Sequence, residues 1–146
     1  MGEVKNDTFI AKLIERGCVT VNTDSSLEAV VDMLVKWRIG TVVVVDHLNM
    51  QVLGILSERD VIHHLSERKK LDGMVAQDIM TAEVITVDQQ VTSSELVHLM
   101  TENRIRHVPI TKDNKLVGIV SIGDVVKRML EKYERETKLI KQFINS

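Results

Sequence analysis

The sequence has few of the residues that mark several large classes of protein. Of its 146 residues one is a cysteine, and aromatic residues make up only 3%. Cys18 has no second cysteine with which to form an intramolecular disulfide, so a reducing compartment suits the chain. Because aromatic side chains are scarce, Val, Ile, Leu and Met must fill the core. These scarcities exclude a disulfide-stapled scaffold.

An excess of one charge and a long apolar run are also absent. The net charge is −2, so bulk electrostatics would not hold the chain on nucleic acid or on an anionic membrane. No apolar run approaches the roughly 18 residues of a membrane-spanning helix. The opening MGEVKNDTFI lacks the apolar segment of a secretory signal. We therefore expect a cytoplasmic protein with no membrane partner.

The sequence does contain an internal repeat. GILSERDV (54–61) and GIVSIGDV (118–125) carry Gly, Ser and Asp at the same spacing. Upstream, RIGTVVVV (38–45) resembles RIRHVPIT (104–111), 66 positions later. The offset then falls to 64, since Gly54 matches Gly118. A hairpin turn between the two stretches can absorb the two-residue difference. The chain is thus two copies of one unit.

Each copy predicts the order β-α-β-β-α. Polar residues lead into an amphipathic helix, two β-branched runs follow across a turn, and a second helix begins at the Ser of the shared motif. A unit of about 60 residues buries little surface alone. We therefore predict an α/β (α+β) fold in which two units pack around an approximate twofold axis. The expected strands are 19–21, 41–46 and 51–56 in the first copy, and 84–87, 107–111 and 115–120 in the second.

Five segments follow from this pattern. They are an N-terminal helix (1–17), the first repeat (18–70), a linker (71–83), the second repeat (84–130) and a C-terminal helical tail (131–146). Along the last helix, Met129, Tyr133, Ile140 and Ile144 recur at spacings near four and seven. Such a stripe predicts packing on the chain's own domain or on a second subunit.

The Ser-x-x-Asp motif at a helix start has two interpretations. It approximates a capping box, in which the Ser hydroxyl accepts a first-turn N–H and the acid bonds back to the Ser amide. The same geometry suits a nucleotide, because a helix N-terminus attracts phosphate and a carboxylate accepts hydrogen bonds from a ribose diol. Cations for a phosphate are distributed unequally, since Arg59 lies in the first motif and Gly123 takes its place in the second.

These residues resemble a known family. The repeat, the RIRHVPI stretch and the paired GILSERD and GIVSIGD stretches look like a tandem pair of cystathionine-β-synthase (CBS) domains, a Bateman module, over about residues 14–130. The resemblance implies a regulatory module that binds adenosine nucleotides between its repeats, and a homodimer of stacked modules. One departure is Val43, which stands where the second copy has Pro109.

Carried over position by position, the resemblance implies two ligand sites. Asp124 and Asp60 would be the ribose acids, and the Asp124 site is expected to be the occupied one because the Asp60 site lacks a counterpart of Arg59. The primary site comprises Asp124, Ser121, Arg59, Arg106, His107, Cys18, Val19, Ile39 and Gly40. The second, weaker site comprises Asp60, Ser57, Val84, Ile85, Ile105 and again Arg106.

AMP is the expected ligand, because Arg59, Arg106 and His107 make a compact group suited to a monophosphate. NAD(H) is the second choice, and ATP, ADP and S-adenosylmethionine are further alternatives. No catalytic cofactor is expected, and the partner would be an enzyme or transporter that the sequence does not name.

Three other functions stay open. Catalysis is disfavoured because no second carboxylate accompanies either acid, and the adjacent His63 and His64 point to different faces of a helix and should be solvated, so no metal is expected. Nucleic-acid binding rests only on the basic stretch NRIRH. A module that binds protein partners without any ligand is the third possibility. We expect no enzyme.

Overall fold

The computed structural model describes residues 7–67 and 70–145; the ends of the two expected terminal segments, 1–6 and 146, lie outside this range. The elements of the first half are α1 (Asp7–Arg16), β1 (Thr20–Val21), α2 (Leu27–Trp37), β2 (Thr41–Val45), β3 (Val52–Ser57) and α3 (Glu58–Ser66). Those of the second half are α4 (Ala76–Ile79), β4 (Val87–Asp88), α5 (Ser93–Asn103), β5 (His107–Lys112), β6 (Lys115–Ser121) and α6 (Ile122–Ile144).

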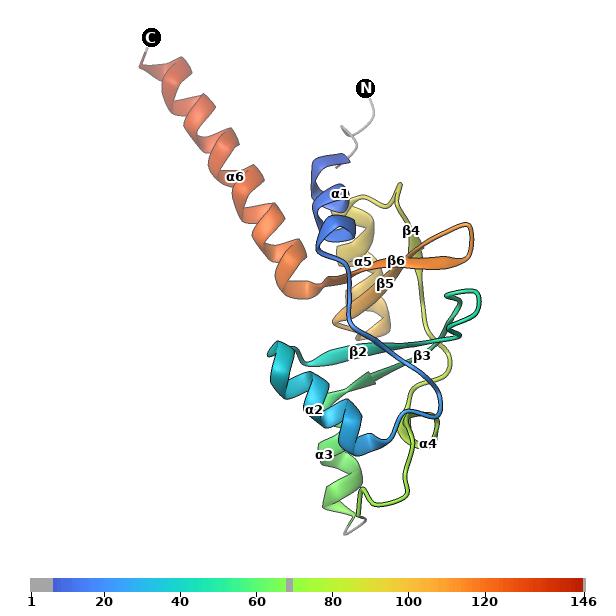
Figure 1. The fold of residues 1–146 in the computed structure, drawn as a ribbon. Helices are drawn as coiled ribbons and strands as arrows, with labels where there is room; N and C mark the ends of the chain where they lie inside the picture. Colours follow the sequence, from blue (N-terminus) through green and yellow to red (C-terminus); the bar gives the residue numbers. More distant parts are fainter. Residues whose placement is uncertain (1–6, 68–69, 146) are drawn as a thin grey trace.

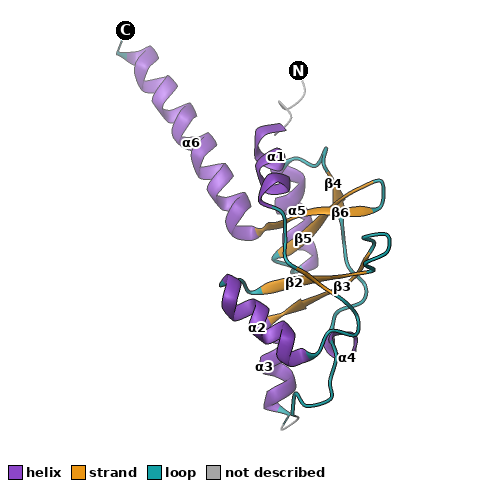
Figure 2. Cartoon of the chain, viewed as in Figure 1, coloured by secondary structure: helices purple, strands orange, loops and turns teal. Residues whose placement is uncertain are grey.

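Two three-stranded sheets form the centre of the molecule. Their strand orders are β1-β2-β3 and β4-β5-β6, and in each the first pair is parallel and the second antiparallel. The sheets face each other and helices cover their outer sides, as Figures 1 and 2 show. The predicted α/β architecture of two similar repeats is confirmed.

The apolar run of β2 explains the layering. Val42 and Val44 pack into the core beneath α2 and α3, whereas Val43 and Val45 pack with Leu116 between the two sheets. A strand buried on both faces has no need of polar alternation. The amide of Leu116 also donates to the carbonyl of Met50 (2.9 Å), which bonds one repeat to the other.

Two of the three segments that sequence patterning put outside the repeats pack into their cores. Ile10 and Leu13 of α1 are buried in the core of the second repeat. Ala76 of α4, a four-residue helix inside the expected linker, is buried in the core of the first repeat. Each repeat is therefore completed by the segment that precedes the other one. A helix of four residues is too short to give a periodic pattern, so the sequence did not reveal it.

One predicted strand is largely wrong. Residues 84–87 were expected to form a strand, but β4 covers only Val87 and Asp88. The parallel register pairs Val87 with Ile110, so Val84 would fall opposite His107, where β5 begins. β5 therefore lies opposite residues 84–86 as well, but the pairing starts only at Val87, after the position of Pro109, which has no N–H to donate. Residues 84–86 are irregular.

The helix α6 continues well beyond the second repeat. Its 23 residues confirm that the predicted tail extends the last helix, and Figure 1 shows the helix running away from the rest of the chain. Tyr133, Ile140 and Ile144 are 67%, 60% and 72% exposed. The stripe does not pack on its own domain.

Candidate functional site

Both Ser-x-x-Asp motifs are complete capping boxes. The Ser57 amide donates to Asp60 Oδ2 (2.8 Å), and the Asp60 amide donates to Ser57 Oγ (3.2 Å). The corresponding distances for Ser121 and Asp124 are 2.9 and 3.1 Å. The predicted capping role is confirmed in both repeats. Sequence alone indicated it because every partner lies within three residues.

The boxes also use up donors that a phosphate would need. The first amide of α3, at Glu58, donates to the carbonyl of Gly40 (2.8 Å), and the first amide of α6, at Ile122, donates to the carbonyl of Arg106 (2.8 Å). A helix N-terminus attracts anions through its unpaired N–H groups. Since most are already paired here, side-chain cations must contribute more to anion binding.

The largest cavity beside these helix starts lies between the repeats. It has a volume of about 580 Å³ and we call it the Ser121 cavity. Its wall combines the stretch after α1, the end of α2 and the ends of β5 and β6. The lining residues are Arg16, Gly17, Cys18, Val19, Trp37, Ile39, Gly40, Thr41, His107, Ile119 and Ser121.

Six of the nine residues expected in the primary site line this cavity: Cys18, Val19, Ile39, Gly40, His107 and Ser121. Asp124 is bonded to Ser121 but lines a neighbouring hollow between α1 and α6, which we call the α1–α6 groove. Arg59 and Arg106 line a third hollow, the Asp60 cavity. The structure thus gathers the expected backbone and hydroxyl groups in one cavity and the expected arginines in the next.

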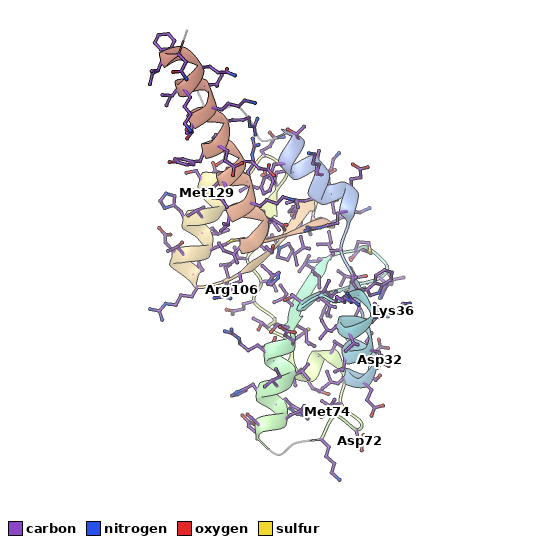
Figure 3. All side chains as sticks on the ribbon, turned by 90° about the vertical axis from the view of Figure 1, so that its left-hand side faces the viewer. Asp32, Lys36, Asp72, Met74, Arg106 and Met129 are labelled. Carbon is purple, nitrogen blue, oxygen red and sulfur yellow. The ribbon has the colours of Figure 1, made fainter. Side chains whose placement is uncertain are left out.

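The Asp60 cavity is smaller, about 330 Å³, and is lined by more basic than acidic side chains. Its lining is Gly40, Thr41, Ile55, Ser57, Glu58, Arg59, Asp60, Thr81, Arg104, Ile105, Arg106 and His107. Ser57, Asp60, Ile105 and Arg106 of the expected second site are among them, while Val84 and Ile85 are not. We expected this site to be short of a cation, but three arginines line it. Figure 3 labels Arg106 at the level where the two repeats meet.

The two cavities adjoin. Gly40, Thr41 and His107 line both of them, and Thr41 Oγ1 lies 3.3 Å from His107 Nδ1 across the junction of the repeats. Arg38 and Arg104 end the first helix of each repeat in the left-handed region (φ 51° and 53°). The residue after each, Ile39 or Ile105, then lines a cavity. A ligand bound in the Ser121 cavity would therefore lie next to the cavity that Arg59, Arg104 and Arg106 line.

The structure reveals a site residue that sequence reasoning missed. Arg16, the last residue of α1, donates from Nη1 to Asp124 Oδ1 and from Nη2 to Asp124 Oδ2, both at 3.0 Å. Its Nη2 also donates to the carbonyl of Ile119 (3.0 Å). A terminal basic residue on a short helix gives no signal for a partner 108 positions away. Only the packing of α1 on β6 brings the two together.

Burial and this ion pair set the protonation of the site. Burial opposes ionisation of Asp124, but Arg16 and the Ser121 hydrogen bonds outweigh it and hold the pKa of Asp124 below its ordinary value. Burial lowers the pKa of His107, and nearby Arg106 adds to this while Asp124 opposes it. Burial raises the pKa of Cys18 to about 11, so its thiol is protonated at neutral pH and is a poor nucleophile.

The paired histidines lie in different surroundings. His63 is exposed, with Nε2 3.2 Å from Glu67 Oε1, whereas His64 is buried with Nε2 3.1 Å from the carbonyl of Lys70. They do point to different faces, but the expected solvation is wrong for His64. Within residues 7–67 and 70–145, no cluster of three or more His, Cys, Asp or Glu side chains is arranged to hold a metal ion.

No helix in the described part of the chain has both the length and the apolar character that crossing a membrane requires.

Comparison with known proteins identifies the repeats. The CBS domain family model matches residues 10–67 and 75–131, so each match includes part of α1 or all of α4. Among curated proteins, the mitochondrial CBS domain-containing protein CBSX3 of Arabidopsis thaliana is 34% identical over an alignment of 126 residues that covers 84% of this chain and 61% of the relative. The chain thus spans about three fifths of that relative's length.

Two solved structures share the fold. A CBS domain protein from Pyrobaculum aerophilum complexed with AMP has a TM-score of 0.71 and 27% identity, and the match covers 83% of this chain and 89% of that one. The CBS domain pair of protein MJ0100, in complex with 5′-methylthioadenosine and S-adenosyl-L-methionine, has a TM-score of 0.70 and 25% identity, covering 77% and 92%. With two matched repeats and this fold, the chain belongs to the CBS domain family and is a CBS domain pair.

Proposed function

We propose that this CBS pair binds an adenosine nucleotide, with AMP as the first choice, in the Ser121 cavity. The observation that carries the proposal is the cavity's position. It lies between the repeats, beside a helix whose first turn carries both a hydroxyl and a carboxylate. The AMP complex of the Pyrobaculum relative supports the same ligand class. The two ligands of the MJ0100 complex share an adenosine moiety with AMP, which supports adenosine as the part that is recognised.

The cavity offers a suitable surface to each part of AMP. Val19, Trp37 and Ile39 provide apolar surface for a flat base, and the backbone at Cys18 and Gly40 provides polar groups for its edge. Ser121 lines the cavity, and Asp124, whose amide donates to Ser121 Oγ (3.1 Å), lies beside it, so ribose hydroxyls at this side of the cavity would donate to the carboxylate.

The phosphate would lie toward the junction with the Asp60 cavity. His107 belongs to both cavities, and Arg59 and Arg106 lie on the far side of that junction. Guanidinium groups bind phosphate through paired charge-assisted hydrogen bonds. NAD(H) is the second candidate, because a dinucleotide could extend from one adjoining cavity into the other.

Binding at this junction would regulate the protein by tightening it. A ligand that contacts both repeats favours the conformation in which they are closest, by its differential affinity for the two states. The surface presented by the helices then changes, and we propose that an enzyme or transporter responds to it. In this scheme the chain carries no catalytic activity of its own.

Thermal melting with a ligand panel tests the proposal. A ligand at 100 times its Kd should stabilise the fold by about 2.7 kcal/mol. We expect AMP to raise the Tm most among AMP, ADP, ATP, NAD(H) and S-adenosylmethionine, and Asp124→Ala to abolish the rise. If no adenosine compound raises the Tm of the wild type, the chain is a ligand-free interaction module or, if it binds RNA with a steep salt dependence, a nucleic-acid-binding one.

We further propose that two copies stack through their repeat helices. Val35, Ile62 and Leu65 on α2 and α3, and Met129 on α6, are large apolar side chains between 46% and 73% exposed. Sedimentation should show a dimer that Ile62→Glu dissociates. The matched control, Ile140→Glu, changes an equally apolar exposed residue far along α6 and should leave the dimer intact. Dissociation by the control alone would assign dimerisation to the C-terminal helix instead.

We propose last that the protein is cytoplasmic. A single, protonated cysteine suits the reducing cytoplasm. The Arabidopsis relative is named as mitochondrial, so fractionation of cells that express the tagged chain is the direct test.

A further inference from the structure

The carboxylate expected to bind ribose is already occupied. Each carboxylate oxygen has about two acceptor positions. Oδ1 of Asp124 accepts from Arg16 Nη1, and Oδ2 accepts from Arg16 Nη2 and from the Ser121 amide. A ribose diol donates two further hydrogen bonds and needs an acceptor for each. One open position is insufficient, so the diol and Arg16 compete for Asp124.

The other repeat lacks this competitor. Asp60 Oδ2 accepts from the amide and hydroxyl of Ser57 (2.8 and 3.0 Å), and none of the residues that the structure describes forms an ion pair with Asp60. With the 66-residue offset of the repeats, the position equivalent to Arg16 is Ala82. The competitor is thus a property of one site and not of the repeat.

If a ligand displaced Arg16 from Asp124, the α1–α6 groove would be an unfavourable place for its guanidinium. The α1–α6 groove is lined by Lys12, Lys127, Arg128 and Arg135 as well as by the single further acid Glu131. Like charges repel in this hollow, so it is a poor place for the freed guanidinium. Arg16 also lines the Ser121 cavity, where the ligand lies. An anionic group on the ligand could replace Asp124 there as a charged partner of Arg16.

We propose that Arg16 is a selectivity residue of the Ser121 cavity, which holds Asp124 until a ligand supplies an anionic group in its place. This inference rests on the proposed function. It predicts that a nucleotide such as AMP binds well because its phosphate, lying toward His107, gives the Arg16 guanidinium an anionic partner inside the cavity that both residues line. A nucleoside such as adenosine binds weakly because it breaks the ion pair without replacing it.

Calorimetric titration of AMP and adenosine into wild type and Arg16→Gln tests the proposal. Arg16→Gln should lower the Kd of adenosine about fivefold, because adenosine no longer has to break a partly exposed ion pair in order to bind. AMP should bind no tighter than to the wild type, so the preference for AMP over adenosine falls. The control Lys12→Gln removes a charge from the same helix and groove without touching Asp124, and should leave the preference unchanged.

Ionic strength gives a second readout that a purely structural residue would not move. Salt screens the exposed ion pair; the Arg16 side chain is 51% exposed. Adenosine should therefore bind the wild type more tightly as NaCl is raised, and should bind Arg16→Gln with no such gain. If Arg16→Gln folds poorly, Arg16→Lys keeps the charge without the paired geometry, and should give an intermediate preference and salt response.

The outcomes separate this inference from the proposed function. If wild type binds AMP but Arg16→Gln weakens AMP and adenosine equally, or alters neither, Arg16 is not a selectivity residue and the nucleotide function stands. If wild type binds neither compound, the proposed function fails and this inference fails with it.

Discussion

Asp60 and Asp124 hold the same position in two copies of one unit, yet their surroundings differ. Both close a capping box with the preceding Ser. Asp124 is also clamped by Arg16 beside a large, partly apolar cavity. Asp60 lacks such a clamp among the described residues and lies in a smaller cavity with three arginines. Duplication kept the local hydrogen bonds, and the divergence lies in what packs around them.

The origin of the difference is the crossed packing of the repeats. The segment before the first repeat, α1, packs on the second sheet, and the segment before the second repeat packs on the first. In both cases a glycine admits the crossing backbone. Gly118 faces Leu13 and Ile14 of α1, and Gly54 faces Met80 and Thr81. Because the two crossing segments differ, they deliver Arg16 to one acid and only Ala82 to the vicinity of the other.

The largest expected effect is on AMP affinity, when Asp124 and Asp60 are removed in turn. Asp124→Ala should weaken AMP binding roughly 100-fold, because two charge-assisted hydrogen bonds of about 1.5–3 kcal/mol each are lost, while the ion pair with Arg16 no longer has to be broken and offsets part of that loss. The matched Asp60→Ala should change the Kd less than about threefold. The fluorescence of Trp37, the only tryptophan and a lining residue of the Ser121 cavity, reports binding there.

The reverse order of these two effects would make the Asp60 cavity the principal site. An AMP titration that leaves Trp37 fluorescence unchanged while calorimetry records binding would indicate the same.

The next largest effect should be the difference in stability between alanine substitutions at Gly54 and Gly118. At Gly54 an added Cβ would overlap Met80 and lie 3.0 Å from the carbonyl oxygen of Thr81, which is paired with the amide of Ile55. Gly54→Ala should therefore destabilise the fold by about 1–3 kcal/mol, measured by urea unfolding. At Gly118 the nearest atoms are 3.4 Å away, so Gly118→Ala should cost less than about 1 kcal/mol. Equal losses would mean that Met80 and Thr81 do not pack against Gly54 more tightly than Leu13 and Ile14 pack against Gly118.

The smallest expected effect is the response of stability to acid. A carboxyl whose pKa is lowered on folding stabilises the protein above its unfolded pKa of about 3.9, and that contribution disappears as the pH falls through the folded pKa. Asp124 is such a group. Wild type should therefore be more stable than Asp124→Asn at pH 6, and the difference in unfolding free energy should shrink below about pH 4. A constant difference from pH 6 to pH 3 would mean that folding does not lower the pKa of Asp124.

The sequence by itself determined what depends on neighbours along the chain. The residues expected around the Ser121 cavity came from the resemblance to CBS domain pairs. The repeat, the helix starts at Ser57 and Ser121 and the two β-branched strands of each copy all followed from motif spacing and apolar pattern. These features depend on residues a few positions apart, which is the range over which propensity, capping and periodicity act.

Only the tertiary structure decided which segment completes which repeat. A short α4 carries too little pattern to be recognised, and nothing near Arg16 or Asp124 indicates that they meet. The distribution of arginines between the two cavities was likewise misjudged, since it depends on how the sheets face each other. Contacts across 108 positions arise from packing, and packing is set by the whole core rather than by any local stretch.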